Sequence, residues 1–212
     1  MSGDWKTADC PPGVTRRILM MRHGETDASA KGRCYGKTDV PLSEAGRLQV
    51  KRAATLIQPL QPDAIFTSPR IRASDSAAIV AQACQISVHT EEHFAELDFG
   101  DCEGKRYEDV ERENPEFYAR WMASPTDVTF PNGESYAAMA TRVISTYQQL
   151  VNTAGHTKLL LVAHGGVNRI ILAHVLGIAP EHVFRLEQTY AGLSCIDYYD
   201  STPLLRVMNA TL

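Results

Sequence analysis

The chain has 212 residues, of which 44% are hydrophobic and 22% charged, a balance typical of a globular protein with a substantial core. Its net charge of −4 gives the surface no general attraction for nucleic acid or for an anionic membrane. An anionic substrate would therefore have to be bound by a local cluster of cations.

The cysteines and the apolar segments indicate where the protein works. The five cysteines include no CxxC pair, which argues against a disulfide framework and a zinc site. The apolar runs are too short to span a membrane, and the N-terminus has no apolar segment of the kind a secretion signal needs. We expect a cytoplasmic protein that binds neither nucleic acid nor membrane.

Apolar periodicity predicts alternating strands and helices. Residues 1–13 are polar and contain Pro and Gly, and predict a flexible leader before a single domain over residues 14–212. The expected strands cover residues 16–22, 64–67, 86–89, 158–163, 192–199 and 204–208. The expected helices cover residues 43–60, 68–84, 134–153 and 167–176, the second with Ser68 as N-cap and Pro69 in its first turn. This alternation is typical of a three-layer α/β/α fold with a mostly parallel sheet, and the charged segment 90–132 predicts an insertion of loops and short helices.

Two of the expected strands end in the same pair of residues, His23-Gly24 and His164-Gly165. Ligands of open α/β sheets bind at the carboxyl ends of the strands, so the two imidazoles should share one crevice. A phosphate there would need guanidinium donors, and Arg22 stands beside His23. A second guanidinium could come from Arg70 or Arg72, at the start of the helix expected over residues 68–84. The spacing alone does not decide between these two arginines.

Six ordered blocks resemble the signature of the histidine phosphatase superfamily, the phosphoglycerate-mutase-like proteins. The blocks are Arg22-His23-Gly24-Glu25-Thr26, Asp39-Val40-Pro41-Leu42-Ser43 with Gly46, Thr67-Ser68-Pro69-x-x-Arg72-Ala73, Glu96-x-x-Phe99-Gly100-x-x-Glu103-Gly104, Pro131-x-Gly133-Glu134-Ser135 and Val162-Ala163-His164-Gly165-Gly166. The resemblance implies that His23 accepts the phosphoryl group and that Arg22, Arg72 and His164 form a phosphate clamp. It also implies that Glu96 donates a proton to the leaving group, and it favours Arg72 over Arg70.

The same resemblance adds Thr26, Ser29 and Gly165 to the expected substrate-binding set. Ser29 stands where many members have an asparagine, and the loop through Lys31 and Arg33 is the alternative source of that contact. No metal or other cofactor is expected, because phosphoryl transfer to histidine needs little beyond in-line positioning and charge neutralisation. Tyr118 and Trp121 are expected either to pack within the insertion or to line the substrate pocket.

The substrate is expected to be a small-molecule phosphate ester. A mutase usually has an Arg after the catalytic Glu and a longer insertion, whereas this chain has Glu96-Leu97 and a short segment 104–133. An inactive phosphate-binding module would be expected to lose a catalytic residue, and none is missing. The segments 32–42 and 99–104 most resemble α-ribazole phosphatases, with broad-specificity and sugar- or amino-acid-phosphate phosphatases as alternatives. The sequence does not define the oligomeric state, and a homodimer is one candidate.

Overall fold

The computed structural model describes residues 5–152 and 155–212. In this part of the chain one sheet has the strand order β3-β2-β4-β1-β5-β6. The strands are β1 (Arg16–Arg22), β2 (Ala64–Thr67), β3 (Val88–Thr90), β4 (Lys158–Ala163), β5 (Leu193–Tyr199) and β6 (Thr202–Ala210). The first four are parallel to one another, and β5 and β6 are added in antiparallel fashion. The expected mostly parallel sheet is confirmed.

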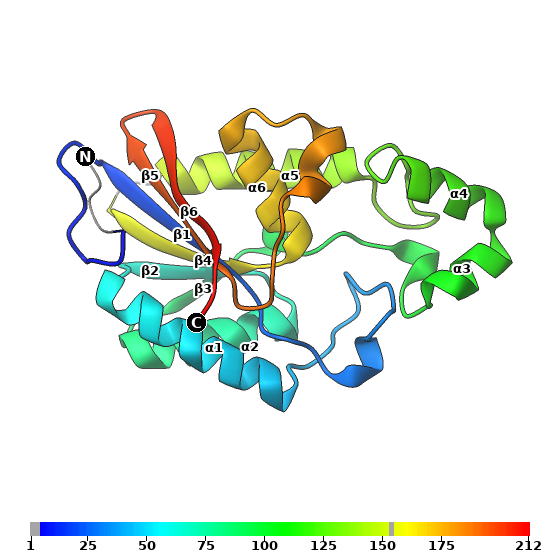
Figure 1. Cartoon of the computed structure of the whole chain (residues 1–212), viewed down its shortest axis with the longest axis horizontal. Coiled ribbons are helices and arrows are strands. Elements are labelled where there is room, and N and C mark those ends of the chain that lie inside the picture. Colours follow the sequence, from blue (N-terminus) through cyan, green and yellow to red (C-terminus); the bar gives the residue numbers. More distant parts are fainter. Residues whose placement is uncertain (1–4, 153–154) are drawn as a thin grey trace.

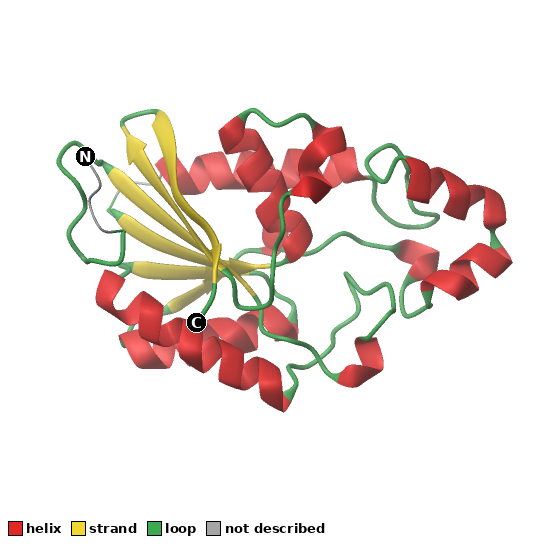
Figure 2. Ribbon diagram, viewed as in Figure 1, coloured by secondary structure: helices red, strands yellow, loops and turns green. Residues whose placement is uncertain are grey.

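Helices cover both faces of the sheet (Figures 1 and 2). One face packs against α1 (Glu44–Ile57) and α2 (Ile71–Cys84), and the other against α5 (Tyr136–Asn152) and α6 (Gly165–Leu176). The short helices α3 (Tyr107–Glu113) and α4 (Pro115–Ala123) lie beyond the ends of the strands, away from both layers (Figure 1). The single-turn helices are η1 (Ala28–Ala30), η2 (Gln58–Leu60), η3 (Glu92–Phe94), η4 (Gly100–Cys102) and the longer η5 (Pro180–Arg185). Within the described residues no helix is both long enough and apolar enough to cross a bilayer.

Side-chain alternation along β1 explains why helices are needed on both faces. Ile18 and Met20 belong to the cluster beneath α5 and α6, whereas Leu19 and Met21 belong to the cluster beneath α1 and α2. All four are fully buried. Because successive side chains of a strand point to opposite faces, a strand of continuous apolar residues requires a cover on each side.

The predicted start of α2 was wrong. The helix begins at Ile71 with Arg70 in the N-cap position, so Ser68 and Pro69 precede it. The Ser68 hydroxyl is instead bonded to Nε2 of His164 (2.7 Å), and it accepts a hydrogen bond from the Arg70 N–H (3.2 Å). The Ser68 side chain, which the local sequence predicts to cap the helix, therefore makes a tertiary contact with His164 instead.

Parts of two predicted elements lie outside the residues that the structure describes. Residues 1–4 of the expected leader, and Thr153 at the expected end of α5, lie outside the described residues. Within residues 5–13, Trp5 packs against the cluster of α1 and α2, and the Thr7 carbonyl accepts a hydrogen bond from Arg17 (3.0 Å). The insertion forms an apolar cluster together with Cys34 from the loop after β1; its insertion residues are Cys102, Val110, Phe117, Trp121, Val128 and Phe130.

Candidate active site

The register of β1 against β4 brings the two histidines together. Arg22 pairs with Ala163 at the carboxyl ends of the two parallel strands, so the next residues are His23 and His164. Their ring centroids lie 5.2 Å apart, and the His23 N–H donates to the Ala163 carbonyl (2.9 Å). Parallel pairing thus places the two rings side by side, but only His23 lines the cavity, so the prediction that both imidazoles share the crevice is met by His23 alone.

His23 has one ring nitrogen fixed and one free. Its Nδ1 lies 2.7 Å from the Gly24 carbonyl, an acceptor, so Nδ1 is the protonated nitrogen and Nε2 keeps its lone pair. Burial, reinforced by the Arg22 and Arg72 guanidinium groups, holds the pKa of His23 well below its usual value of 6.5. The imidazole is therefore neutral near pH 7, the form in which it is a nucleophile.

Arg72 is fully buried, and each part of its guanidinium has a partner. Nη2 donates to the Gly36 carbonyl (2.7 Å), Nη1 donates to the Thr38 carbonyl (2.9 Å), and Nε donates to Nδ1 of His164 (3.3 Å). Arg70 is only half-buried and donates to the Lys37 carbonyl (3.0 Å). Arg72 lines the same cavity as His23, and Arg70 does not, which is the placement that the resemblance implies.

His164 is fully buried behind the cavity, and both of its ring nitrogens have protein partners. Burial lowers the pKa of His164 well below 6.5, with Arg72 as the next largest cause. The neutral ring accepts from Arg72 at Nδ1 and donates to Ser68 at Nε2. For His164 to bind a phosphate oxygen, one of these contacts has to be exchanged.

Arg22 faces the cavity with an unused donor. Its Nη1 donates to the Gln188 carbonyl (2.6 Å), and its guanidinium carbon lies 4.1 Å from the ring centroid of Tyr190. The Nε atom is buried and has no hydrogen-bond partner among the described residues. A buried N–H without a partner costs free energy unless a ligand satisfies it, so this atom suits an anion.

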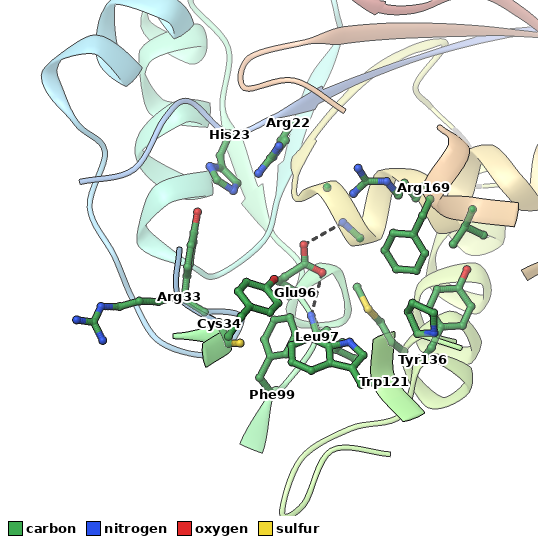
Figure 3. Close-up of a pocket in the computed structure, with 18 of the residues that line it drawn as sticks. Arg22, His23, Arg33, Cys34, Glu96, Leu97, Phe99, Trp121, Tyr136 and Arg169 are labelled. Atoms are coloured by element: carbon green, nitrogen blue, oxygen red, sulfur yellow. Dashed lines mark hydrogen bonds between the residues drawn. The ribbon is translucent and has the colours of Figure 1, made fainter. Parts of the chain in front are cut away.

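Glu96 lies in the same cavity, held by two backbone donors (Figure 3). Oε1 accepts from the Leu97 N–H (3.0 Å), and Oε2 accepts from the Gly166 N–H (2.9 Å). A Cβ atom at position 166 would lie 2.3 Å from Oε1, so glycine is needed there for the carboxylate to occupy its place. The chain around His164 thus also positions Glu96.

The cavity has a volume of about 370 Å³ and a mixed lining. In Figure 3, Phe99 and Trp121 lie on the side of Glu96 away from His23. The aromatic and apolar lining comprises Cys34, Tyr35, Leu97, Phe99, Tyr107, Trp121, Met122, Pro125, Tyr136, Met139, Val183 and Phe184. Trp121 therefore lines the cavity, whereas Tyr118 packs against the apolar cluster of the insertion.

Arg169 is a cavity residue that sequence reasoning missed. Its Nε donates to the Leu186 carbonyl (2.9 Å). A Cβ atom on Gly165 would lie 3.0 Å from Nη1 of Arg169 and 3.5 Å from Nε of Arg22, so the two guanidinium groups flank Gly165. The available signal was its position one helical turn after Gly165, on the same face of α6.

Thr26 and Ser29 lie outside the cavity lining, whereas Arg22, Arg72 and Gly165 belong to it. The buried Thr26 hydroxyl is bonded to the Tyr35 hydroxyl (3.0 Å) and does not line the cavity. Ser29 is exposed on η1, where its N–H donates to Asp27 (2.9 Å), and it does not line the cavity either. Arg33, from the same loop, does line it, whereas Lys31 is exposed and does not.

Known proteins are similar to this chain in both sequence and fold. The profile of the histidine phosphatase superfamily (branch 1) matches residues 18–211. The adenosylcobalamin/α-ribazole phosphatase of Salmonella typhimurium is 29% identical over 194 residues, covering 92% of this chain and 96% of that protein.

Two solved structures superimpose closely. The α-ribazole phosphatase from Shigella flexneri has a TM-score of 0.85 and 29% identity, covering 92% of this chain and 96% of that one. A mycobacterial glucosyl-3-phosphoglycerate phosphatase has a TM-score of 0.81 and 29% identity, covering 92% and 99%. With the profile match spanning nearly the whole chain, the protein belongs to the histidine phosphatase superfamily and is a phosphatase.

Proposed function

We propose that this phosphatase hydrolyses a small phosphate ester through a phosphohistidine on His23, with α-ribazole 5′-phosphate as its substrate. The observation that supports the mechanism best is the neutral His23, whose Nδ1 is held by the Gly24 carbonyl, in one cavity with Glu96.

In the first step Arg22 and Arg72 bind the oxygens of the phosphoryl group, joined by His164 once one of its present contacts is exchanged. Nε2 of His23 attacks phosphorus, the bond from phosphorus to the ester oxygen breaks, and Glu96 gives its proton to the departing alkoxide. In the second step the Glu96 carboxylate takes a proton from water. The resulting hydroxide attacks phosphorus, the N–P bond breaks, and phosphate leaves.

The proposal for the alcohol part of the substrate rests on the aromatic residues that line one side of the cavity. Tyr107 is stacked on Trp121, with ring centroids 5.2 Å apart and planes inclined by 24°, and both line the cavity. Flat aromatic surfaces of this kind suit a flat base on the alcohol. α-Ribazole 5′-phosphate has such a base, a benzimidazole, attached to its ribose.

A second candidate is a phosphate ester with a carboxylate close to the phosphate, as in an amino-acid or glycerate phosphate. Arg169 favours it, because its guanidinium lies in the cavity next to Arg22 and Glu96 and could pair with a carboxylate.

Two measurements test these assignments. Rapid quench with labelled substrate should trap an acid-labile, base-stable phosphoprotein in the wild type and none in His23→Ala; normal turnover by that variant would contradict the mechanism. A kcat/KM panel with α-ribazole 5′-phosphate, phosphoserine, 3-phosphoglycerate and a hexose phosphate then ranks the substrates. A higher kcat/KM for the carboxylate-bearing esters would replace the first candidate by the second.

A further inference from the structure

The carboxylate of Glu103 is surrounded by donors from two separate segments. From residues 36–38 it accepts the backbone N–H groups of Gly36 (3.0 Å), Lys37 (2.9 Å) and Thr38 (3.0 Å), together with the Thr38 hydroxyl (2.5 Å). From the segment after Glu96 it accepts the N–H of Phe99 (3.1 Å). Burial alone would raise the pKa of Glu103, but these hydrogen bonds outweigh it and the pKa lies below its usual value. Glu103 is therefore ionised near neutral pH and is not a proton donor.

The loop held by Glu103 is the one that holds Arg72. The peptide unit between Gly36 and Lys37 gives its N–H to Glu103 and its carbonyl to Nη2 of Arg72. Because a peptide unit is planar and rigid, its orientation at one end sets its orientation at the other. The Thr38 carbonyl accepts a hydrogen bond from Nη1 of Arg72, while the N–H and the hydroxyl of the same Thr38 donate to Glu103.

The same carboxylate also reaches the segment that contains Glu96. A Cβ atom on Gly36 would lie 1.6 Å from the Leu97 carbonyl oxygen, so the two backbones are in direct contact. The Leu97 N–H donates to Glu96, and the Phe99 N–H donates to Glu103. Glu103 itself does not line the cavity.

We propose that Glu103 is a positioning residue that fixes Arg72 and Glu96 relative to each other through loop 36–38 and segment 97–99. The inference rests on the roles given to Arg72 and Glu96 under the proposed function. An ionised carboxylate suits this role because all of its oxygen lone pairs accept, and five donors converge on it. A glutamine would place an NH₂ group against some of those N–H donors and shift the loop.

The test compares Glu103→Gln with Glu108→Gln, which makes the same change at an exposed position of α3. Glu103→Gln should lower kcat/KM by roughly 10–100-fold, the loss expected for a misplacement of about 1 Å. The loss should appear with p-nitrophenyl phosphate, because Arg72 acts on the phosphoryl group, and should be larger with an alkyl phosphate, whose leaving group also needs the proton of Glu96. The inhibition constant of vanadate should rise in parallel, the shape of the pH profile should be unchanged, and Glu108→Gln should match the wild type.

Three results would overturn the inference. The first is a folded Glu103→Gln protein with wild-type kcat/KM and wild-type vanadate affinity. The second is a loss of kcat/KM confined to the alkyl phosphate, which would show that Glu103 does not position Arg72. If Glu103→Gln does not fold, Thr38→Val, which deletes only the hydroxyl donor, should show a smaller loss of both quantities, and unchanged values would overturn it. Arg72→Ala is measured alongside. If that variant keeps full activity, the proposed clamp is wrong, independently of the outcome at Glu103.

Discussion

Oε2 of Glu96 accepts a hydrogen bond from the backbone N–H of Gly166, the second residue of α6 (2.9 Å). The candidate acid is thereby fixed to the turn that follows His164. The position of Glu96 therefore depends on the turn that joins β4 to α6 as well as on the backbone of the adjacent Leu97.

If Glu96 is the general acid, the effect of Glu96→Gln on the rate of His23 phosphorylation should depend on the leaving group. An alkoxide needs a proton in the transition state, a contribution of about 10²–10⁴ in rate, whereas nitrophenolate leaves readily without one. The burst of His23 phosphorylation should slow far more with an alkyl phosphate than with p-nitrophenyl phosphate. Asp101→Asn, which alters an exposed carboxylate bonded to Asn132, is the control and should change neither burst. Equal slowing for both substrates would exclude Glu96 as the acid.

Arg72→Ala and Arg70→Ala should differ sharply. Removing a buried phosphate donor should cost roughly 2–4 kcal/mol of transition-state stabilisation, by analogy with oxyanion donors. Arg70 lies outside the cavity lining, so its removal should leave kcat/KM within a few-fold of wild type. Steady-state kinetics with one substrate measures both, and the opposite ranking would contradict the assignment.

Activity should not depend on a metal ion. In residues 5–152 and 155–212 no three His, Cys, Asp or Glu side chains are grouped as a metal site. Hydrolysis should survive exhaustive EDTA treatment, and vanadate should inhibit because it mimics five-coordinate phosphorus. A chelated enzyme that is inactive until magnesium is added would show the prediction to be wrong.

Stability should fall on the acidic side of pH 6.5. His23 and His164 have pKa values lowered by burial, so below their usual value of 6.5 the unfolded chain binds protons that the folded chain does not. Each such histidine should reduce the free energy of unfolding by up to about 1.4 kcal/mol per pH unit below that point and have no effect above it. Urea unfolding at several pH values measures the slope. His23→Asn should reduce the slope, and an unchanged slope would mean that His23 is protonated in the folded enzyme.

Arg169→Met tests the second substrate candidate. The change keeps an apolar stem but removes the charge that lies beside Gly165. If a carboxylate of the substrate binds there, KM for phosphoserine should rise by about 10-fold or more, the cost of losing a charged hydrogen bond. KM for a hexose phosphate should change little. Equal effects on both substrates would place Arg169 on the phosphoryl group itself.

The sequence predicts features that depend on local pattern or on an ordered motif. β1 occupies the predicted residues 16–22, because a continuous apolar run ends there at His23-Gly24. Glu96 was identified by resemblance alone, since nothing in its local sequence separates it from neighbouring carboxylates. The bond from Ser68 to His164 and the stacking of Tyr190 on Arg22 join segments far apart in the chain, and no local pattern announces such pairs.

The apolar cluster of the insertion is separate from the two clusters that flank the sheet. Tyr107, Met122 and Phe184 line the cavity yet remain exposed, so none of them supports the core on which His23 and Glu96 are mounted. Substitutions at these three positions should therefore change which leaving groups the cavity accepts while lowering the free energy of unfolding only slightly. Selection for new substrates could proceed there while the phosphoryl-transfer residues stay untouched.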